Sequence, residues 1–287
     1  MVTGASGVIG RAAIPVLLER DPEVRAAIRR PEDADLLRAL GAKVTLGRLD
    51  DAPSLAEVLQ GVHTVVHLVG GVNQVSDDEV MAANHRSTLI ALGAARSSGV
   101  RRFILLSYPG ASLDARDPFL RAKGIAEEAV AHSGLEHAIL RCTHVYGAGG
   151  LWFTSFVEAA RNGFVVGDGT QAVAPVFSED VARAIAALDD AEEPVGGTWS
   201  LEGPDPTPAE RLAAQLLGST SFEHVAPPDA QLRLEQLLGI PVSRATCELF
   251  AADSRGDAED ASTAFGLART TFADGISRVA ASLGLEG

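Results

Sequence analysis

The chain has 287 residues, of which 46% are hydrophobic and 22% charged, enough for one large α/β domain with a lobe or for two modest domains. This composition, without a dominant short repeat, excludes collagen-like, disordered and coiled-coil proteins. The formal net charge of −14 argues against nucleic acid as a partner, because a duplex would be repelled.

The cellular setting follows from what the sequence contains. Two cysteines, Cys142 and Cys247, cannot build a disulfide framework, so we expect a reducing, cytoplasmic compartment. No run approaches the ~20 apolar residues of a membrane span. Met1–Gly10 lacks the basic region of a signal peptide. The first predicted strand, Met1–Thr3, is shorter than the ~5–6 residues usual for a strand, which leaves open whether the native chain begins upstream of Met1.

Short apolar runs alternate with amphipathic patterns along the first half of the chain. The predicted strands are Met1–Thr3, Val24–Ile28, Lys43–Leu46, Thr64–Val69, Phe103–Ser107 and Ala138–Arg141. The predicted helices are Ala12–Arg20, which contains Pro15, and Leu36–Leu40, Leu55–Leu59, Val80–Ser98 and Phe119–Ser133. Nearly continuous apolar strands separated by helices predict an α/β fold, a Rossmann-type doubly wound parallel sheet covered on both faces.

The pattern changes near Gly147–Gly150, which we interpret as a hinge. We therefore expect residues 1–147 to form a dinucleotide-binding Rossmann domain. Residues 148–287 would form a smaller substrate and C-terminal lobe that returns some strands to the main sheet. The elements predicted there are strands Val173–Phe177 and Thr198–Leu201, helix Glu179–Ala187, and a mostly helical remainder with turns at Pro227–Pro228, Gly239–Pro241 and Asp253–Asp260.

The clearest motif lies at the start of the chain. It reads Thr3-Gly4-Ala5-Ser6-Gly7-Val8-Ile9-Gly10, with glycine at every third position. Gly4 permits a tight strand-to-helix turn, Gly7 lets a pyrophosphate approach the backbone, and Gly10 lets the helix pack against the strand. The helix N-terminus then offers free N–H groups to the anion. A purely structural turn is the alternative, and the strand and helix context favours dinucleotide binding.

Basic residues at the end of the second predicted strand bear on the choice of cofactor. Arg29 and Arg30 stand where an NAD enzyme usually has an acidic residue for the ribose 2′-hydroxyl. Arginine favours a 2′-phosphate instead, so NADP(H) is favoured over NAD(H). Arg11 would add a second charge, and Asp50 would face the adenine. A solvated pair of arginines and a plain loop aspartate are the alternatives.

The carboxyl ends of parallel strands are where ligands bind. Candidates at these ends are Leu68, Val69, Gly70, Gly71, Ser107, Tyr108 and Thr143–Tyr146, of which Leu68, Val69 and Thr143 are expected to border the cofactor. Lys43 and Lys123 are the sole lysines among 24 basic residues. Lysine can lower its pKa and exchange a proton, which arginine cannot. Lys123 is therefore a candidate catalytic residue, and a solvent-facing helix lysine is the alternative.

These features resemble the extended or atypical short-chain dehydrogenases/reductases, among them NmrA-like proteins and the dehydrogenase-like accessory subunit of respiratory complex I. The matching stretches are Val2–Gly10, Val24–Arg30, Phe103–Ser107, Pro118–Glu127, Leu140–Gly147, Pro175–Ala184 and Trp199–Gly203. The resemblance covers Met1 to about Gly203. It implies a Rossmann fold, binding of NAD(P)(H) and oxidoreductase activity.

The resemblance also implies a catalytic set of a serine, a tyrosine and a lysine four residues after the tyrosine. Ser107 and Lys123 match, but the tyrosine position holds Phe119. Phenylalanine has no ionisable proton, so ordinary dehydrogenation, epimerisation and dehydration are in doubt. Isoflavone-reductase-like members dispense with the tyrosine and use the lysine for proton transfer. Asn84 resembles the family's structural asparagine, which would bridge backbone and water near the lysine, and a plain polar helix residue is equally compatible.

Other polar and aromatic side chains could also bind a metal, donate a proton or line a ligand pocket. His63 and His67 share a strand face without a third ligand nearby, so we expect no metal. His144 would lie near the site, either as a proton donor or as a hydrogen-bonded structural residue. Ser107 lacks the Gly-x-Ser-x-Gly context of a hydrolase nucleophile. The aromatic residues Trp152, Phe153, Phe156 and Phe164 would line an apolar pocket or belong to the core.

Together these features predict an atypical NADPH-dependent short-chain dehydrogenase/reductase. Lys123 would hold the nicotinamide ribose and supply a proton, and Ser107 would polarise the oxygen of an apolar small molecule such as a quinone, an aromatic compound or a prenyl-like compound. The alternative, which Phe119 favours, is a non-catalytic NADP(H) redox sensor or structural module of the NmrA type. We expect a monomer or homodimer that binds neither nucleic acid nor a metal.

Overall fold

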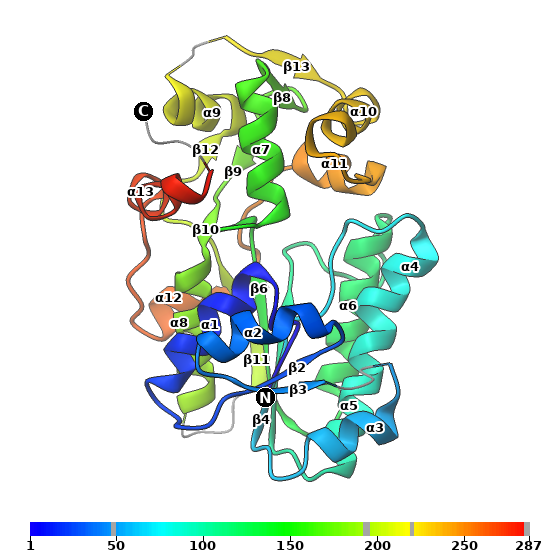
Figure 1. Cartoon of the computed structure of the whole chain (residues 1–287). Helices are drawn as coiled ribbons and strands as arrows, with labels where there is room; N and C mark the ends of the chain where they lie inside the picture. The colour runs from blue at the N-terminus through cyan, green and yellow to red at the C-terminus, as the bar shows by residue number, and fades with distance from the viewer. Residues whose placement is uncertain (47–49, 192–195, 219–220, 284–287) are drawn as a thin grey trace.

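A parallel sheet organises the molecule in the computed structural model, which describes residues 1–46, 50–191, 196–218 and 221–283. Within these residues the sheet, of which Figure 1 labels β2, β3, β4, β6 and β11, has eight strands in the order β14-β11-β6-β5-β4-β1-β2-β3. Every pairing in it is parallel. The strands are β1 (Val2–Thr3), β2 (Arg25–Ile28), β3 (Lys43–Leu46), β4 (Thr64–His67), β5 (Arg102–Ser107), β6 (Glu136–Cys142), β11 (Gly196–Leu201) and β14 (Glu259–Asp260). The predicted doubly wound α/β fold is confirmed.

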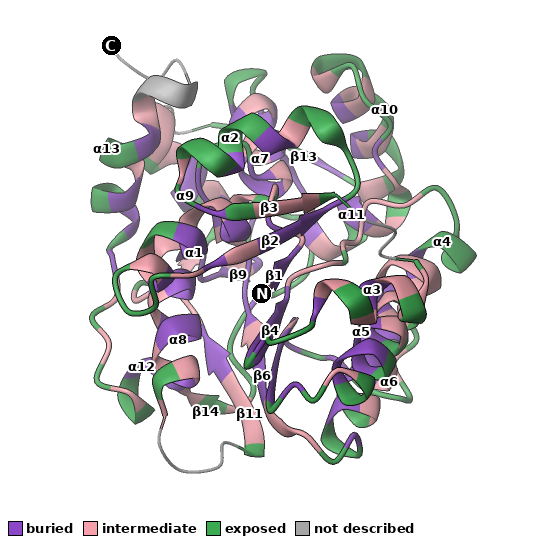
Figure 2. Ribbon diagram, turned by 60° about the horizontal axis from the view of Figure 1, so that its bottom comes forward, coloured by how far each residue is buried: buried purple, intermediate pink, exposed green. Residues whose placement is uncertain are grey.

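The central strands of this sheet are buried, purple in Figure 2, and their alternate side chains pack in two cores. On one face, Val66 and Ile104 pack in a core with α1 (Val8–Leu18), α2 (Ala34–Ala39), α8 (Ser178–Asp190) and α12 (Ala261–Ala264). On the other, Val65 and Phe103 pack with α3 (Ala52–Val58), α5 (Ser87–Ser97) and α6 (Pro118–Ala131). A short 3-10 helix, η1 (Pro31–Asp33), precedes α2.

The shortest strand occupies the centre of the sheet. In β1, Val2 pairs with Ala26 of β2 on one side and with Val66 of β4 on the other. The strand order reverses between β1 and β4, so a crevice for a ligand opens beyond their carboxyl ends. The predicted site residues lie at this end.

The predicted helix Val80–Ser98 is a helix of three parts. It begins with α4 (Asp77–Met81), continues as the π-helical segment η2 (Ala82–Arg86) and ends as α5. Such π-helical turns are frequent at functional sites. The segment η2 contains the candidate residue Asn84, which is fully buried.

The second half of the chain builds a smaller lobe around its own apolar core. Its helices are α7 (Leu151–Arg161), α9 (Ala209–Leu217), α10 (Pro227–Leu238), α11 (Arg244–Phe250) and α13 (Phe272–Leu283). Its strand pairs are β7 (Val145–Tyr146) with β10 (Val176–Phe177), β9 (Ala172–Val173) with β12 (Thr207–Pro208), and β8 (Phe164–Val166) with β13 (Glu223–Val225). The strands β11 and β14 belong to the main sheet, and the domain boundary at residue 147 stays a prediction.

Two predictions in this lobe are wrong, and proline explains both. The single strand Val173–Phe177 is two strands, β9 and β10, because the chain changes partner at Pro175, which has no N–H to donate. The predicted turn at Pro227–Pro228 is the beginning of α10. Proline suits the first turn of a helix, where an N–H group would have no intrahelical partner.

Among the residues that the structure describes, we find no helix with the length and apolar character needed to span a membrane.

Candidate functional site

The glycine loop has the geometry of an anion cradle. Gly4 has a φ of +70°, and a Cβ atom there would lie 2.8 Å from the carbonyl carbon of Leu68. A Cβ on Gly10 would lie 2.5 Å from Cα of Ala5, whereas a Cβ on Gly7 would meet the Gly4 carbonyl oxygen at 3.3 Å and nothing else within 4 Å. Gly7 caps α1 without any side-chain hydrogen bond. The N–H groups of the first turn therefore face a space that an anion can approach.

The other residues of this loop divide between core and surface. Ala5 and Ile9 are buried against the sheet, whereas Ser6, Gly7 and Val8 keep access to solvent. Leu68 and Val69 follow β4 directly beside Gly4. The loop therefore borders the crevice at its centre.

One hollow extends from this crevice toward β2, and we call it the Arg29 groove. It has a volume of about 460 Å³, and Thr3, Arg29, Asp50, Val69 and Gly70 are among the residues that line it. Arg29 is exposed, and its side chain makes no ion pair or hydrogen bond within the described part of the chain. A free guanidinium at this place fits the charge of a phosphate.

The neighbouring arginines lie elsewhere. Arg30 forms an ion pair with Asp33 at 3.1 Å, and it does not line the groove. Arg11 donates to the carbonyl oxygen of Ala148 on the α1 side of the molecule. The expectation that Arg11 adds charge to the pocket of Arg29 is therefore wrong, because Arg11 lines a different hollow beside Ala148 and not the Arg29 groove.

A second hollow, the Lys123 pocket, meets the Arg29 groove at Gly70 and Gln74, which line both. It has a volume of about 420 Å³. Its polar lining includes Ser107, Tyr108, Lys123, Thr143 and His144, and its apolar lining includes Leu68, Phe119, Trp152, Leu249 and Phe250. The pocket thus combines an aromatic wall with a few hydrogen-bonding groups, which is typical of small-molecule sites.

Lys123 is a buried cation at the floor of this pocket. It projects from α6, and its Nζ donates a hydrogen bond of 3.0 Å to the carbonyl oxygen of Leu106. Burial lowers the pKa of Lys123 to about 8, and the negative charge of Glu127 partly offsets this effect. The Phe119 ring lies one turn earlier, with its centroid 5.9 Å from Nζ. The lysine can therefore act as a charge and as a proton carrier near neutral pH.

Asn84 fixes the loop between the two hollows. Its Oδ1 accepts from the Gly71 N–H at 3.0 Å, and its Nδ2 donates to the Gly71 carbonyl oxygen at 2.9 Å. Gly70 has a φ of +138°, and a Cβ there would collide with Asn84 Oδ1 and lie 3.0 Å from Lys123 Nζ. Asn84 thus holds the backbone that separates groove from pocket, close to Lys123.

Two hydroxyl groups at strand ends differ in their freedom. Ser107 is buried, and its Oγ has no hydrogen-bond partner within the described residues, although the residue lines the pocket. Thr143 Oγ1 donates to the Ala174 carbonyl oxygen at 2.5 Å. Ser107 therefore has an unused hydrogen-bonding group beside the pocket, and Thr143 borders the pocket with its hydroxyl already engaged.

The outer wall of the pocket is a cluster of rings. His144 stacks on Trp152 at 4.7 Å between centroids, and Tyr108 packs edge-on against Phe119 at 5.8 Å. Tyr108 Oη lies 2.8 Å from Ser254 Oγ. Of the aromatic residues expected near the site, Trp152 lines this pocket, whereas Phe153, Phe156 and Phe164 pack in or against the core of the smaller lobe.

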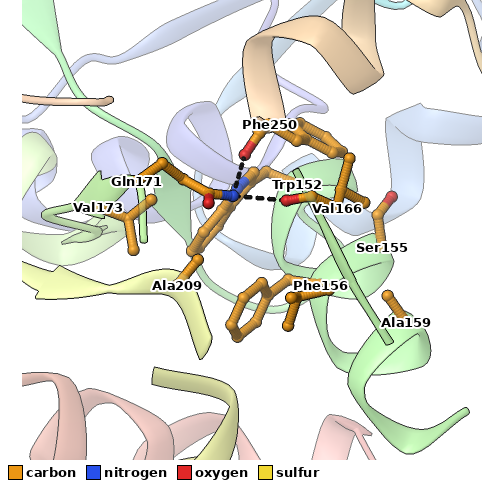
Figure 3. Close-up of a pocket in the computed structure, with 10 residues that line it drawn as sticks. Trp152, Ser155, Phe156, Ala159, Val166, Gln171, Val173, Ala209 and Phe250 are labelled. Atoms are coloured by element: carbon orange, nitrogen blue, oxygen red, sulfur yellow. Dashed lines mark hydrogen bonds between the residues drawn. The ribbon is translucent and has the colours of Figure 1, made fainter. Parts of the chain in front are cut away.

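The C-terminal part of the wall was not predicted from the sequence. Leu249 and Phe250 close the pocket from α11, and Asn73 accepts from the Ser243 N–H at 2.8 Å, which ties the loop after β4 to the start of α11. Behind the wall, Gln171 Nε2 donates to the carbonyl oxygens of Val166 and Phe250 beside a cavity of about 20 Å³ (Figure 3). No motif in the sequence marks these residues.

The two histidines near β4 each contact a different threonine and do not form a metal site together. His63 Nδ1 contacts Thr64 Oγ1, and His67 Nδ1 contacts Thr3 Oγ1, each at 2.9 Å. Burial lowers the pKa of His67 to about 3, so its ring is neutral. Among the described residues no group of histidine, cysteine, aspartate or glutamate side chains could hold a metal ion.

Comparison with known proteins agrees with this geometry. A family model described as NAD(P)H-binding matches residues 4–191. The chain is 33% identical over 226 residues to NADH dehydrogenase [ubiquinone] 1 alpha subcomplex subunit 9, mitochondrial, from Arabidopsis thaliana, a match that covers 74% of this chain. It spans only 55% of the length of that relative.

Two further matches cover nearly the whole chain. Quinone oxidoreductase 2 of Escherichia coli is 25% identical over 293 residues, with 97% of each chain covered. The structure of Citrobacter sp. triphenylmethane reductase complexed with NADP(H) superposes with a TM-score of 0.75 at 20% identity, covering 96% of this chain and 98% of that one. The latter likeness shows a shared fold.

Proposed function

Because the chain belongs to the NAD(P)H-binding family that matches residues 4–191, we propose that it is an NADPH-dependent oxidoreductase that reduces an apolar small molecule. The family membership agrees with the resemblance to atypical short-chain dehydrogenases/reductases noted in the sequence. Relatives described as a quinone oxidoreductase, a ceramide reductase and a triphenylmethane reductase support reductase chemistry. The substrates in these names are those of the related proteins and are not assigned to this chain.

One observation carries the proposal: the Arg29 groove, which contains an unpaired guanidinium, joins the aromatic Lys123 pocket, which contains a buried ammonium group. The two hollows meet at Gly70, beside the glycine loop. A dinucleotide with its pyrophosphate on α1 would place its adenosine in the Arg29 groove and its nicotinamide at the mouth of the Lys123 pocket. The pocket beyond has room and apolar lining for the acceptor.

The preference for NADP(H) rests on Arg29. Its unpaired guanidinium would bind the 2′-phosphate, while Asp50, which lines the same groove, would face the adenine. Gly4–Gly10, Leu68 and Val69 would surround the pyrophosphate and the nicotinamide ribose. Arg30 is a weaker candidate than Arg29, because Asp33 already pairs with it.

Each candidate catalytic residue receives a role from its contacts. The bound reduced nicotinamide would supply a hydride. Lys123 would bind the ribose hydroxyls, and its pKa of about 8 lets it exchange a proton near neutral pH. Ser107 would donate its free hydroxyl to the ligand, and Asn84 would keep Gly70 and Gly71 in place between cofactor and acceptor.

The experiment is NADPH oxidation in the presence of quinones, enones and aromatic carbonyl compounds. We expect turnover with at least one acceptor, a loss of turnover in Lys123→Met, and little change in Phe119→Leu, since Phe119 carries no transferable proton. Tight NADPH binding without turnover for any acceptor would contradict the enzyme and favour a redox-sensing module.

A further inference from the structure

Reduction of a carbonyl compound needs a proton at the oxygen as well as a hydride at the carbon. Phe119 cannot give that proton, and Lys123 Nζ already donates to the Leu106 carbonyl oxygen and is assigned to the ribose hydroxyls. We propose that Tyr108, hydrogen-bonded to Ser254, donates a hydrogen bond and then the proton to the carbonyl oxygen of an aromatic ketone or quinone bound in the Lys123 pocket. This inference rests on the proposed function and assigns it a catalytic residue and a substrate class.

The position of Tyr108 carries the first part of the argument. It directly follows Ser107 at the carboxyl end of β5 and lines the pocket. Its ring packs edge-on against Phe119, with 5.8 Å between centroids, and the Phe119 ring in turn lies 5.9 Å from Lys123 Nζ. The Phe119 ring therefore contacts the Tyr108 ring and also lies near Lys123 Nζ.

The hydrogen bonds around the hydroxyl leave its proton available. Ser254 Oγ accepts the His144 backbone N–H at 3.3 Å and lies 2.8 Å from Tyr108 Oη. The serine can therefore donate its own proton to the tyrosine oxygen. Tyr108 Oη lies 3.2 Å from Nδ1 and 3.4 Å from Nε2 of His144. A neutral imidazole has one acceptor nitrogen, so the carbonyl oxygen of a ligand would replace His144 as the acceptor of the Tyr108 proton.

The protonation states agree with a donor role. Burial raises the pKa of Tyr108, so the phenol keeps its proton at neutral pH. Burial also lowers the pKa of His144 to about 3, so this neighbour is neutral and does not compete as a cation. A neutral phenol in an aromatic pocket is a good donor to a carbonyl oxygen and does not attract ions.

The aromatic lining indicates the substrate class. The rings of His144 and Trp152 are nearly parallel and stacked, with an interplanar angle of 8° and 4.7 Å between centroids, and both residues line the pocket. A planar aromatic ligand can pack against such rings. A ketone or quinone carbonyl in the plane of that ligand would then accept from Tyr108.

The step balances with NADPH as the reductant. With a ketone, the carbonyl carbon receives a hydride with its electron pair, and the π pair of the C=O bond becomes the new O–H bond. With a quinone, one carbonyl oxygen receives the hydride, the ring becomes aromatic, and the second oxygen forms the new O–H bond with the proton of Tyr108. The O–H bond of Tyr108 breaks, and the tyrosinate is stabilised by the hydroxyl of Ser254 until it regains a proton from water. NADP⁺ and the alcohol or hydroquinone leave.

Ligand binding without cofactor gives the first test. Fluorenone and fluorene differ by one carbonyl oxygen, and Trp152 lies in the pocket, so quenching of its fluorescence in a Trp199→Phe background measures both dissociation constants. Tyr108→Phe should weaken fluorenone binding about 3- to 10-fold and leave fluorene unchanged. Tyr146→Phe makes the same chemical change at a buried tyrosine outside the pocket and should alter neither. Equal effects on both ligands, or none, would overturn the proposal.

Turnover gives the second test. A triarylmethyl cation accepts hydride without a proton, whereas a quinone needs both. Tyr108→Phe should lower kcat/KM for the quinone by ~100-fold or more and leave that for the cation nearly unchanged. Equal losses would overturn the proton-donor role. If the wild-type protein reduces neither acceptor, the proposed function fails, and the fluorenone–fluorene difference still decides whether Tyr108 binds a carbonyl oxygen.

Discussion

The Arg29 groove and the Lys123 pocket meet at Gly70 but are built in different ways. The groove is lined within the first 91 residues of the chain, and its charged groups are Arg29 and Asp50 near the ends of β2 and β3 with Glu79 and Arg86 from α4 and η2. The pocket takes its walls from the ends of β4, β5 and β6, from α6 and α7, and from α11 of the smaller lobe. The proposed nucleotide groove is therefore built from one continuous part of the sequence, whereas the proposed acceptor pocket depends on how two lobes pack.

The two regions also differ in how they use charge. Arg29 is exposed and without a partner among the described residues, so a ligand phosphate can supply its counter-charge. Lys123 is buried, and burial lowers its pKa. The guanidinium in the groove thus attracts an anion. In the pocket, burial makes the charged form of Lys123 less favourable, so the lysine can release a proton more easily. Substitutions in the two regions should separate the contribution of the Arg29 groove from that of the Lys123 pocket.

The largest effect is expected where the glycine loop supports both regions. In Gly10→Ala the new Cβ would lie 2.5 Å from Ala5 Cα, so the free energy of unfolding should fall by about 2–3 kcal/mol, with loss of NADPH binding. Gly93→Ala is the matched change in α5, where the nearest atom is 3.8 Å away, and should stabilise by up to about 1 kcal/mol. Chemical denaturation measures both. Equal stabilities for the two variants would contradict the close packing of the loop.

Lys123→Met should separate function from stability. It removes a buried cation, so the protein without cofactor should be at least as stable as the wild type. NADPH affinity should fall by about 1.5–3 kcal/mol through lost charged hydrogen bonds. Calorimetry and thermal unfolding measure the two quantities. A variant that loses stability but keeps cofactor affinity would show that the lysine is structural.

The same lysine predicts a pH dependence. Burial lowers its pKa to about 8, so it is protonated below this pH and neutral above it. NADPH affinity should therefore decline as the pH rises through about 8 in the wild type. Lys123→Met should lack this decline, and an unchanged pH profile would assign the titration to another group.

Arg29→Asp tests the groove alone. It should weaken NADPH binding by about 1–3 kcal/mol and change NADH binding much less, because NADH lacks the 2′-phosphate. Arg30→Asp is the matched control, since Asp33 already pairs with Arg30. Dissociation constants for both coenzymes decide the matter. Similar losses in the two variants would point to a general field effect.

Asn73→Ala tests the contact between lobes and should have the smallest effect. Asn73 donates to the Pro241 carbonyl oxygen at 3.0 Å and accepts from the Ser243 N–H at 2.8 Å. Its loss should cost about 1–2 kcal/mol of stability and raise KM for the acceptor a few-fold, with NADPH affinity unchanged. A change in cofactor affinity alone would mean that the two regions are more tightly coupled than their construction indicates.

The sequence was most informative where contacts are local. The spacing of Gly4, Gly7 and Gly10 predicted the loop at the N-terminus of α1, because each glycine meets backbone a few residues away or just after the adjacent strand. Apolar runs predicted the individual strands, because each run lies within one short segment of the chain. The sequence could not distinguish Arg29 from Arg30, since their difference depends on a pairing with Asp33 that only the fold displays.

The acceptor side was less predictable. Ser254 meets Tyr108 across 146 positions of the chain, and Asn73 meets Ser243 across 170. Such contacts have no sequence period, so Tyr108 could be placed at a strand end but not given a partner. Asn84 was singled out by resemblance, and its bonds to Gly71 depend on the π-helical turn within a pattern that indicates one helix.

The central claim is that a nicotinamide dinucleotide lies with its pyrophosphate on the N-terminus of α1. Gly7→Asp tests it most directly, because Gly7 has a φ of −71° and caps this helix. Aspartate is a good helix cap, so the fold should persist, yet its carboxylate would occupy and repel the phosphate position. Calorimetric titration should show saturable NADPH binding to the wild type and none to the variant. Absence of heat with the wild type for both coenzymes, or equal affinity in the variant, would contradict the account.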